Sequence, residues 1–449
     1  MADKIRILLI TMVVLSTASF SSAINIIYVD VNGPNDPGTG TVESPFLRIQ
    51  NAIDAANTGD VVEIWPGVYT ADPNNYNLDP NGKSITIRST DPNDPEITAN
   101  TIIDPNGAGR GFYFHSGEDP NCIISGLTIR SGLAVDDSGG AIFCYNSNPT
   151  IRNCAIKNNT ADWYGGAMFC ESSSPEITNC TITGNLAIDG GALECWSGTV
   201  TMQKCVISNN TVSGNGGAID CYWQGQAELN NCTVVENSAG SGGGLHCVDD
   251  GKATIQNSIF WSNDAVKGSQ IAIESSLFSM SQVTISYSDV QGGDAMVYVD
   301  PCSIIVWGSG NIDADPCFAL FDVNGDPNLW DFHLQSAYGR WDTNSQNWGY
   351  DSNTSLCIDA GDPNSDWSNE LWPNGKRINM GAYGGMNQAS MNGNPADFDI
   401  NGTVDFADFA ELSKRWLTEE ICVEDLTGNN IVDFGDVAVF AENWLWYKE

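Results

Sequence analysis

The chain has 449 residues, and its 56 acidic residues against 18 basic ones give a formal net charge of -38 at pH 7. A charge of this sign excludes nucleic acid and anionic membranes as partners, because it repels their phosphates. The dense carboxylates favour divalent cations as partners, although solubility alone would also explain them.

The N-terminal segment 1–23 is typical of a secretory signal peptide. Lys4 and Arg6 precede the apolar run ILLITMVVL, and Ser21-Ser22-Ala23 offers small residues for cleavage. The apolar run is too short to span a bilayer, and no later stretch has the length of a membrane span. We therefore expect an exported protein, secreted/extracellular or at the cell surface, with no membrane span.

A capping helix is expected next, over residues 44–59. Ser44 takes the N-cap position, Pro45 the first helical position, and Gly59 stops the helix. The apolar residues on one face can cover the open end of a repeat structure, as solenoids require. These residues are Phe46, Ile49 and Ile53.

The middle of the chain repeats one phrase, in which a glycine pair is followed by a small residue, an apolar residue and a cysteine. The pairs begin at nearly equal steps, at Gly139, Gly165, Gly190, Gly216 and Gly243. A nearly constant step of this size indicates a solenoid. The glycine pairs allow a tight corner with positive φ.

Aligned copies produce columns of like residues, and period-two alternation makes them the inward rows of a parallel β-helix. The apolar columns are Ile142, Met168, Leu193, Ile219 and Leu245; Ile151, Ile177, Met202, Leu229 and Ile255; and Ile156, Ile182, Ile207, Val234 and Phe260. An asparagine column is expected to hydrogen-bond along the axis: Asn159, Asn185, Asn210, Asn237 and Asn263. Crossover chirality favours a right-handed coil.

Two cysteine columns fall on inward positions as well. They are Cys144, Cys170, Cys195, Cys221 and Cys247, and Cys154, Cys180, Cys205 and Cys232 followed by Ser258. Cysteine packs as a small hydrophobe in a narrow interior. Neighbouring rungs lie close enough for disulfides, but side chains in register point the same way, so we favour free, buried thiols over disulfides.

Between the inward rows, other residues are expected to face solvent. One such column contains Phe143, Phe169, Glu194, Asp220 and His246, and the next contains Tyr145, Glu171, Trp196, Tyr222 and Val248. Acids on adjacent rungs beside aromatic rings suit a sugar-binding face. An ordinary polar face is the alternative.

Residues 44–70, SPFLRIQNAIDAANTGDVVEIWPGVYT, followed by these repeats, resemble the right-handed β-helix proteins of the pectin lyase-like superfamily. The resemblance covers residues 24–337 and implies an all-β, right-handed parallel β-helix solenoid. It does not fix an activity, because that superfamily includes lyases, hydrolases, epimerases and adhesins. Residues 338–390, with SLCIDAGDP and KRINMGAYGG, resemble the irregular tail that closes many secreted bacterial β-helix proteins, and we expect them to cap the last coil. Residues 391–396 are expected to be a linker.

A calcium loop, DFDINGTVDFAD, spans residues 397–408. Alternate side chains of such a loop converge on one hard cation, and a glycine at position six allows the sharp turn. The expected ligands are Asp397, Asp399, Asn401, the carbonyl of Thr403, and Asp408.

A second copy, DLTGNNIVDFGD, spans residues 425–436. Its Thr427 is a poorer ligand, and Asn430 replaces the glycine, so this calcium site is expected to be weaker. The matching ligands are Asp425, Thr427, Asn429, the carbonyl of Ile431, and Asp436.

Each loop precedes an amphipathic helix, in which Phe409, Leu412 and Trp416 recur as Val437, Phe440 and Trp444. Residues 397–449 therefore resemble a type I dockerin, a small all-α module with two calcium loops. The resemblance implies calcium-dependent folding and a cohesin-like protein partner. The usual serine-threonine pair of the family is replaced by Phe406-Ala407 and Phe434-Gly435, and a calcium-stabilised tail without a partner is the alternative.

Together these features predict a secreted protein that acts on or binds extracellular polysaccharide. Glu194 and Asp220 are candidate catalytic carboxylates of a glycoside hydrolase, with His246 assisting. Tyr145, Trp196 and Tyr222 are candidate substrate-binding residues. A polysaccharide lyase is a further possibility, with Arg130 or Lys157 as base. A non-catalytic structural or adhesive surface protein is the alternative.

Overall fold

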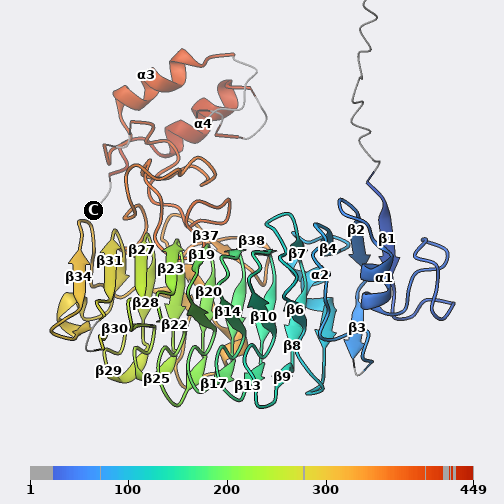
Figure 1. Cartoon of the computed structure of the whole chain (residues 1–449). Coiled ribbons are helices and arrows are strands. Elements are labelled where there is room, and N and C mark those ends of the chain that lie inside the picture. Colours follow the sequence, from blue (N-terminus) through green and yellow to red (C-terminus); the bar gives the residue numbers. More distant parts are fainter. Residues whose placement is uncertain are drawn as a thin grey trace, which may run out of the picture.

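The computed structural model describes residues 24–70, 72–276, 279–399, 401–417, 424, 426–427 and 431–447. The expected signal peptide lies outside the described residues. Short strands recur at the same places in successive coils, and the coils lie side by side along one axis (Figure 1). The register between coils is parallel throughout, from the pairing of β1 with β2 to that of β31 with β34.

Four parallel sheets run along the solenoid in the described part of the chain. Sheet A contains β1 (Ile26–Val29), β2 (Val61–Ile64), β4 (Thr86–Ser89), β7 (Ile123–Ser125), β11 (Thr150–Arg152), β15 (Glu176–Thr178), β19 (Thr199–Gln203), β23 (Gln226–Asn230), β27 (Lys252–Gln256), β31 (Gln282–Ser286) and β34 (Ile304–Trp307). Sheet B contains β6 (Phe112–Phe114), β10 (Ile142–Tyr145), β14 (Met168–Glu171), β18 (Leu193–Trp196), β22 (Ile219–Tyr222), β26 (Leu245–Cys247), β30 (Ile271–Ile273) and β33 (Tyr298–Val299).

The other two sheets complete each coil. Sheet C contains β3 (Gly67–Thr70), β5 (Thr101–Asp104), β8 (Thr128–Arg130), β12 (Ala155–Lys157), β16 (Thr181–Thr183), β20 (Val206–Ser208), β24 (Thr233–Val235), β28 (Ile259–Trp261) and β32 (Asp289–Val290). Sheet D contains β9 (Leu133–Ala134), β13 (Thr160–Ala161), β17 (Leu186–Ala187), β21 (Thr211–Val212), β25 (Ser238–Ser241) and β29 (Asp264–Lys267).

The predicted inward rows are confirmed by the register. For example, Met168 pairs with Leu193 and Cys170 with Cys195, and all four side chains are buried. The cysteines of both columns are buried and free, as predicted. Because the strands alternate side chains with period two, one face of each strand fills the narrow interior with apolar atoms.

The asparagine column forms the predicted ladder inside the corner between sheets C and D. The Asn185 amide nitrogen donates to Asn210 Oδ1 at 2.9 Å, and the Asn210 amide nitrogen donates to Asn237 Oδ1 at the same distance. Each asparagine also donates to a backbone carbonyl of the preceding coil, as Asn210 does to Ile182. The ladder therefore satisfies buried backbone groups at a corner where no strand can do so.

The glycine corner keeps a nearly constant spacing, which corrects the sequence alignment at the fifth copy. Gly216 has φ of 64° and the next corner residue is Gly242, with φ of 66°, not Gly243. Gly268 continues the series with φ of 57°. The run of three glycines at 242–244 hid the correct alignment.

The N-terminal helix is shorter than predicted. Helix α1 spans Ile49–Ala55, and residues 44–48 are not helical because Phe46 pairs its backbone with that of Tyr28 in β1. Its apolar face still packs into the end of the core, where Ile49 and Ile53 are fully buried. Figure 1 shows α1 beside β1 and β2 at the blue end of the solenoid.

A second short helix, α2 (Pro95–Asn100), and the 3-10 turns Gly293–Met296 and Pro327–Leu329 lie in connections. None of the helices in the described ranges has the length and apolar character needed to cross a membrane.

The segment expected to cap the last coil packs sideways on the solenoid instead. Its apolar side chains cover outward residues of sheet C, namely Val206, Val235 and Ile259. This layer begins with the antiparallel strands β35 (Phe318–Leu320) and β36 (Asp331–Leu334) and continues past β37 (Arg340–Asp342) and β38 (Asn347–Gly349). In the view of Figure 1, β37 and β38 are drawn over the middle of the solenoid's length and not at its β34 end. Outward apolar residues on sheet C explain the placement, because they need a cover.

The C-terminal module contains helices α3 (Phe406–Lys414) and α4 (Phe434–Glu442), as the repeat predicted. Its apolar core is shared with the closing segment, since Trp372 packs against it and Trp446 meets Tyr338 at 6.0 Å between ring centres. Residues 391–396, expected to be a linker, are largely buried at this junction. Asn394 Nδ2 donates to Asn443 Oδ1 at 2.8 Å.

Candidate functional site

The outward column of sheet B is buried, contrary to the expectation of a solvent-facing column. Glu194, Asp220 and His246 are 1%, 2% and 1% exposed, respectively. They lie on β18, β22 and β26, with Glu194 directly opposite Asp220 and Asp220 directly opposite His246. The fold therefore brings the three predicted catalytic candidates onto three consecutive rungs.

The glycine corners explain this burial. A Cβ atom added at Gly190 would lie 2.7 Å from Glu194 Oε2, and one at Gly216 or Gly242 would lie 2.7 Å from the Cβ of Asp220 or His246. The backbone of each corner thus folds over the outward side chain four positions later. Glycine at this position supplies both the positive φ and the room for that side chain.

Hydrogen bonds hold the buried acids in place but leave two atoms unpaired. The Trp196 indole nitrogen donates to Glu194 Oε1 at 2.5 Å, and His246 Nδ1 lies 2.8 Å from Asp220 Oδ1. Glu194 Oε2 and His246 Nε2 have no hydrogen-bond partner among the described residues. Unpaired buried polar atoms are uncommon in native proteins.

The burial also shifts the pKa values of Glu194 and His246. Burial, and next the charge of Asp220, raises the pKa of Glu194 well above its usual range. Burial lowers the pKa of His246, but the neighbouring Asp220 carboxylate outweighs it and the net shift is upward. The raised pKa favours the protonated form of Glu194, whose side chain lies opposite the hydrogen-bonded Asp220 and His246 pair.

Aromatic rings cover this acid cluster and extend along sheet B. Trp196 and Tyr222 occupy adjacent rungs, with ring centres 5.2 Å apart and both side chains half-buried. Tyr145 stands in the same column, with Glu171 between it and Trp196. Tyr145 is 43% exposed and Trp223 59%. We call these four rings, from Tyr145, Trp196, Tyr222 and Trp223, the aromatic strip.

Sequence reasoning missed Asp189 and Tyr164 at this site. Burial, and further the charge of Asp220, raises the pKa of Asp189, although the Asn215 amide that donates to it opposes the shift. The Tyr164 ring packs on that of Trp196 at 5.1 Å. Each of these residues directly precedes a corner glycine. Comparing the residue before the glycine pair in every repeat could have identified both from the sequence.

The alternative basic candidates are placed elsewhere. Arg130 and Lys157 are paired in register on sheet C, and Arg130 Nε contacts Asp104 Oδ2 at 2.8 Å. The Arg130 guanidinium is thus engaged by a carboxylate, and the geometry gives no support for Arg130 as a base.

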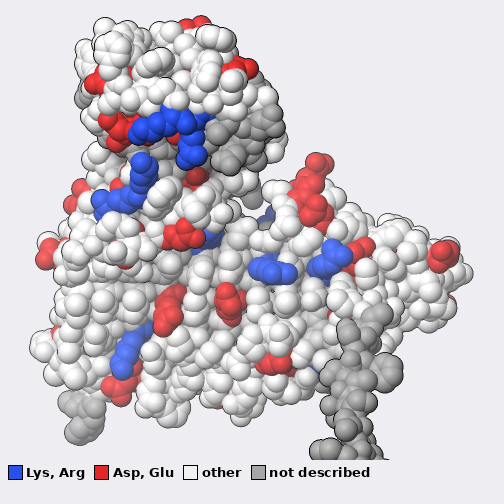
Figure 2. All heavy atoms as spheres, turned by 90° about the horizontal axis from the view of Figure 1, so that it is seen from above, with Lys and Arg blue, Asp and Glu red and all other residues white. Residues whose placement is uncertain are grey.

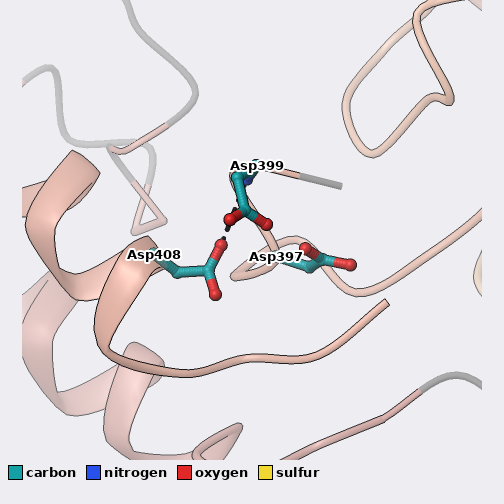
Figure 3. Close-up of side chains that lie close together, drawn as sticks. All are labelled: Asp397, Asp399 and Asp408. Atoms are coloured by element: carbon teal, nitrogen blue, oxygen red, sulfur yellow. Dashed lines mark hydrogen bonds between the residues drawn. The ribbon is translucent and has the colours of Figure 1, made fainter. Parts of the chain in front are cut away.

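The first predicted calcium loop brings its carboxylates together. Oxygen atoms of Asp397, Asp399 and Asp408 lie within 4.8 Å of one another (Figure 3). Asp397 is 5% exposed and Asp408 fully buried, and burial raises the pKa of Asp397. Three converging carboxylates fit a hard cation such as Ca²⁺, which takes oxygen ligands and removes their mutual repulsion. Asn401 and Thr403 belong to the same loop, where the Thr403 N–H donates to Asn401 Oδ1.

The second loop repeats part of this geometry. The Thr427 N–H donates to Asp436 Oδ1 at 2.8 Å, as the Asp399 N–H donates to Asp408 Oδ1 at 3.1 Å. Asp425 and Asn429 lie outside the described residues, while Ile431 and Asp436 lie within them. The two halves also exchange aromatic contacts, Phe406 with Trp444 at 4.9 Å and Trp416 with Phe434 at 5.0 Å.

Comparison with known proteins supports the solenoid. A family described as the right handed beta helix region matches residues 84–260. This agrees with the handedness that crossover chirality predicts. Among curated proteins, the uncharacterized protein YwoF of Bacillus subtilis (strain 168) is 31% identical over 135 residues. That match covers 30% of this chain and 28% of the length of YwoF.

Three solved structures align with part of the chain. A pectate lyase, Pel9A, aligns over 80% of this chain and 96% of its own, with 14% identity and a TM-score of 0.43. The pectin methylesterase from Aspergillus niger aligns over 65% and 84%, with 13% identity and a TM-score of 0.32. A rhamnogalacturonan lyase aligns over 68% and 94%, with 13% identity and a TM-score of 0.32.

Proposed function

We propose that this protein is exported and binds an extracellular polysaccharide along the outer face of sheet B. The aromatic strip carries the proposal. Trp196 and Tyr222 occupy adjacent rungs, about 4.8 Å apart, and Tyr145 lies two rungs before Trp196, so a polymer lying along the solenoid axis can stack sugars on these rings. Within the aromatic strip, Trp223 and Tyr145 have the most exposed rings, at 59% and 43% exposure.

Attachment to another protein is the proposed role of the C-terminal module. Two calcium ions would be held, by Asp397, Asp399, Asn401, Thr403 and Asp408 in the first loop and more weakly in the second. Calcium supplies the charge that lets the converging carboxylates stay ionised. Phe406 and Phe434, 77% and 79% exposed, offer matching apolar contacts to a cohesin-like partner.

Hydrolysis of the bound polymer is the second candidate function. The observation that favours it is the buried Glu194, whose pKa is raised by burial, whose Oε2 atom has no partner among the described residues and which lies opposite Asp220. A protonated carboxylic acid near a carboxylate is the pair that glycoside hydrolysis uses. Because the Gly190 corner covers Glu194 and the Trp196 indole is hydrogen-bonded to it, both groups would have to move before a sugar reached it.

Affinity electrophoresis of the full chain through gels containing neutral and acidic polysaccharides tests the binding. We expect at least one polymer to retard the protein. Substituting Tyr145→Ala and Trp223→Ala together should weaken that binding by about tenfold, because a stacked aromatic contact contributes about 0.5–1.5 kcal/mol. The matched control is Tyr350→Ala, which removes a 76% exposed ring from the closing segment.

The same polymers, incubated with the protein in solution, separate the two candidate functions. New reducing ends that disappear in Glu194→Gln, but persist in the exposed control Glu228→Gln, would establish hydrolysis. Binding without new reducing ends, and without the ultraviolet absorbance of unsaturated lyase products, leaves a binding protein. If no polymer retards the protein, the polysaccharide proposal is wrong, and a structural or adhesive surface protein takes its place.

A further inference from the structure

The charged side chains that the strands of sheet B present to solvent are acidic. In the described part of the chain, none of the strands β6, β10, β14, β18, β22, β26, β30 and β33 contains Lys or Arg. Acidic residues lie on those strands and in the turns that flank them. Those that are at least partly exposed include Asp136, Asp137, Asp162, Glu171, Asp189, Asp249, Asp250 and Glu274.

The two nearest basic side chains are already occupied. The Arg110 guanidinium contacts Asp137 Oδ2 at 2.5 Å, donates to the carbonyls of Gly139 and Ser138, and is 9% exposed. Lys267 Nζ contacts Glu274 Oε1 at 3.3 Å. Neither offers the free fork or point charge with which proteins bind carboxylates and sulfates.

On another side of the molecule, basic and acidic side chains are mixed. Figure 2 shows the face that carries the C-terminal module, where Lys and Arg side chains stand beside Asp and Glu. The single sign of the sheet B face is thus a local feature that the net charge alone does not require.

Without a free Lys or Arg side chain, an acidic polymer could still bind through a cation that bridges its carboxylates to those of the protein. Within the described residues, the one group of acidic or histidine ligands close enough to hold a metal ion is Asp397, Asp399 and Asp408, in the C-terminal module. The acids of sheet B are spread along the strands and do not converge on a point in that way. An acidic polymer would therefore meet repulsion that no ion site of this face relieves.

We propose that the aromatic strip accepts neutral polysaccharides and rejects those rich in uronic acid or sulfate. The inference rests on the proposed function, because it concerns the substrate class of the same face. Stacking on the rings is equally available to neutral and acidic sugars, so the carboxylate field decides between them. Glu171, between Tyr145 and Trp196 in the strip's own column, contributes to this field at closest range.

Matched pairs of polymers test this inference on the full chain. Each neutral polymer (hydroxyethyl cellulose, xylan, galactomannan and methyl-esterified homogalacturonan) is compared with its carboxymethylated or de-esterified form. Binding is measured at low and high salt, with calcium and with a chelator. We expect the neutral member of a bound pair to bind at least about tenfold tighter at low salt, because like charges within a few ångströms repel strongly. The difference should narrow at high salt, which screens exposed charges.

Glu171→Gln should reduce the ratio of the neutral to the acidic polymer's affinity several-fold without weakening binding of the neutral polymer. Glu228→Gln, on the exposed face of sheet A, should leave this ratio unchanged. If the acidic member binds tighter, with or without calcium, the inference is overturned while the proposed function stands. If Glu171→Gln and high salt leave the discrimination intact, the carboxylate field is not its cause and the inference is likewise overturned. If neither member of any pair binds, the proposed function itself fails.

Discussion

Asn210→Ala is expected to lower the free energy of unfolding of the solenoid by about 2–6 kcal/mol. The Asn210 side chain is fully buried and accepts from the Asn185 backbone N–H at 3.0 Å. It also donates to the carbonyl of Ile182 at 3.1 Å. Alanine leaves both backbone groups buried without these partners, and each such group costs about 1–3 kcal/mol.

Urea denaturation followed by far-UV circular dichroism measures this loss as a shift of the midpoint. The matched control is Thr211→Ala, which changes the next residue along the chain, an exposed one in β21. It should change the free energy of unfolding by no more than about 0.5 kcal/mol. Equal stability of the two variants would contradict a continuous asparagine ladder.

The double variant Asp397→Ala, Asp408→Ala is expected to unfold the C-terminal module and to abolish its response to calcium, while the solenoid stays folded. Asp408 Oδ1 and Oδ2 accept from the backbone N–H groups of Asp399 and Asp405, at 3.1 and 2.9 Å. Losing a buried cap with two acceptors costs about 2–4 kcal/mol. Calcium at about a thousand times its dissociation constant would add about 4 kcal/mol to the wild type alone.

Guanidinium denaturation with calcium and with a chelator measures the effect. Pulse proteolysis along the guanidinium series, with fragments identified by mass, reports on the module, and far-UV circular dichroism reports on the solenoid. The matched control, Glu411→Gln with Glu442→Gln, removes two acids from at least partly exposed positions of the same helices. Loss of the solenoid transition in the double variant would show that the two parts do not fold separately. An unchanged calcium response would place the calcium elsewhere.

The shared core at the junction adds a detail to this expectation. Trp372 of the closing segment packs on the module's apolar residues, and its indole nitrogen donates to the carbonyl of Pro395 at 2.8 Å. Unfolding of the module should therefore loosen the part of the closing segment near Trp372. The solenoid coils, on whose sheet C the closing segment lies, are expected to keep their own core.

The inward rows of the solenoid were predictable because their causes repeat. A cysteine or isoleucine that returns once in every coil can be assigned to a row without any tertiary information. The same holds for the asparagine ladder and for the two helices after the acidic loops. In each case the residue type, the spacing and the local chemistry agree.

Features that depend on contacts between different parts of the chain were not predictable in this way. The alternation that places Glu194 outward cannot tell whether something covers it, and the cover is the backbone of Gly190. Ser44 and Pro45 have the composition of a helix start, but pairing of Phe46 with Tyr28 keeps the chain extended there. The closing segment has no repeat, so nothing in its sequence indicated that it would lie on sheet C.

The most direct test of the central claim is hydrogen–deuterium exchange of the full chain, with and without a polymer that it binds. Binding on the aromatic strip predicts protection concentrated in residues 143–146, 162–172, 194–197 and 220–224, which carry the strip and its turns. The outer face of sheet A and the C-terminal module should exchange as before. Protection confined to sheet A, to the module or to the closing segment would contradict the account and move the binding site off sheet B.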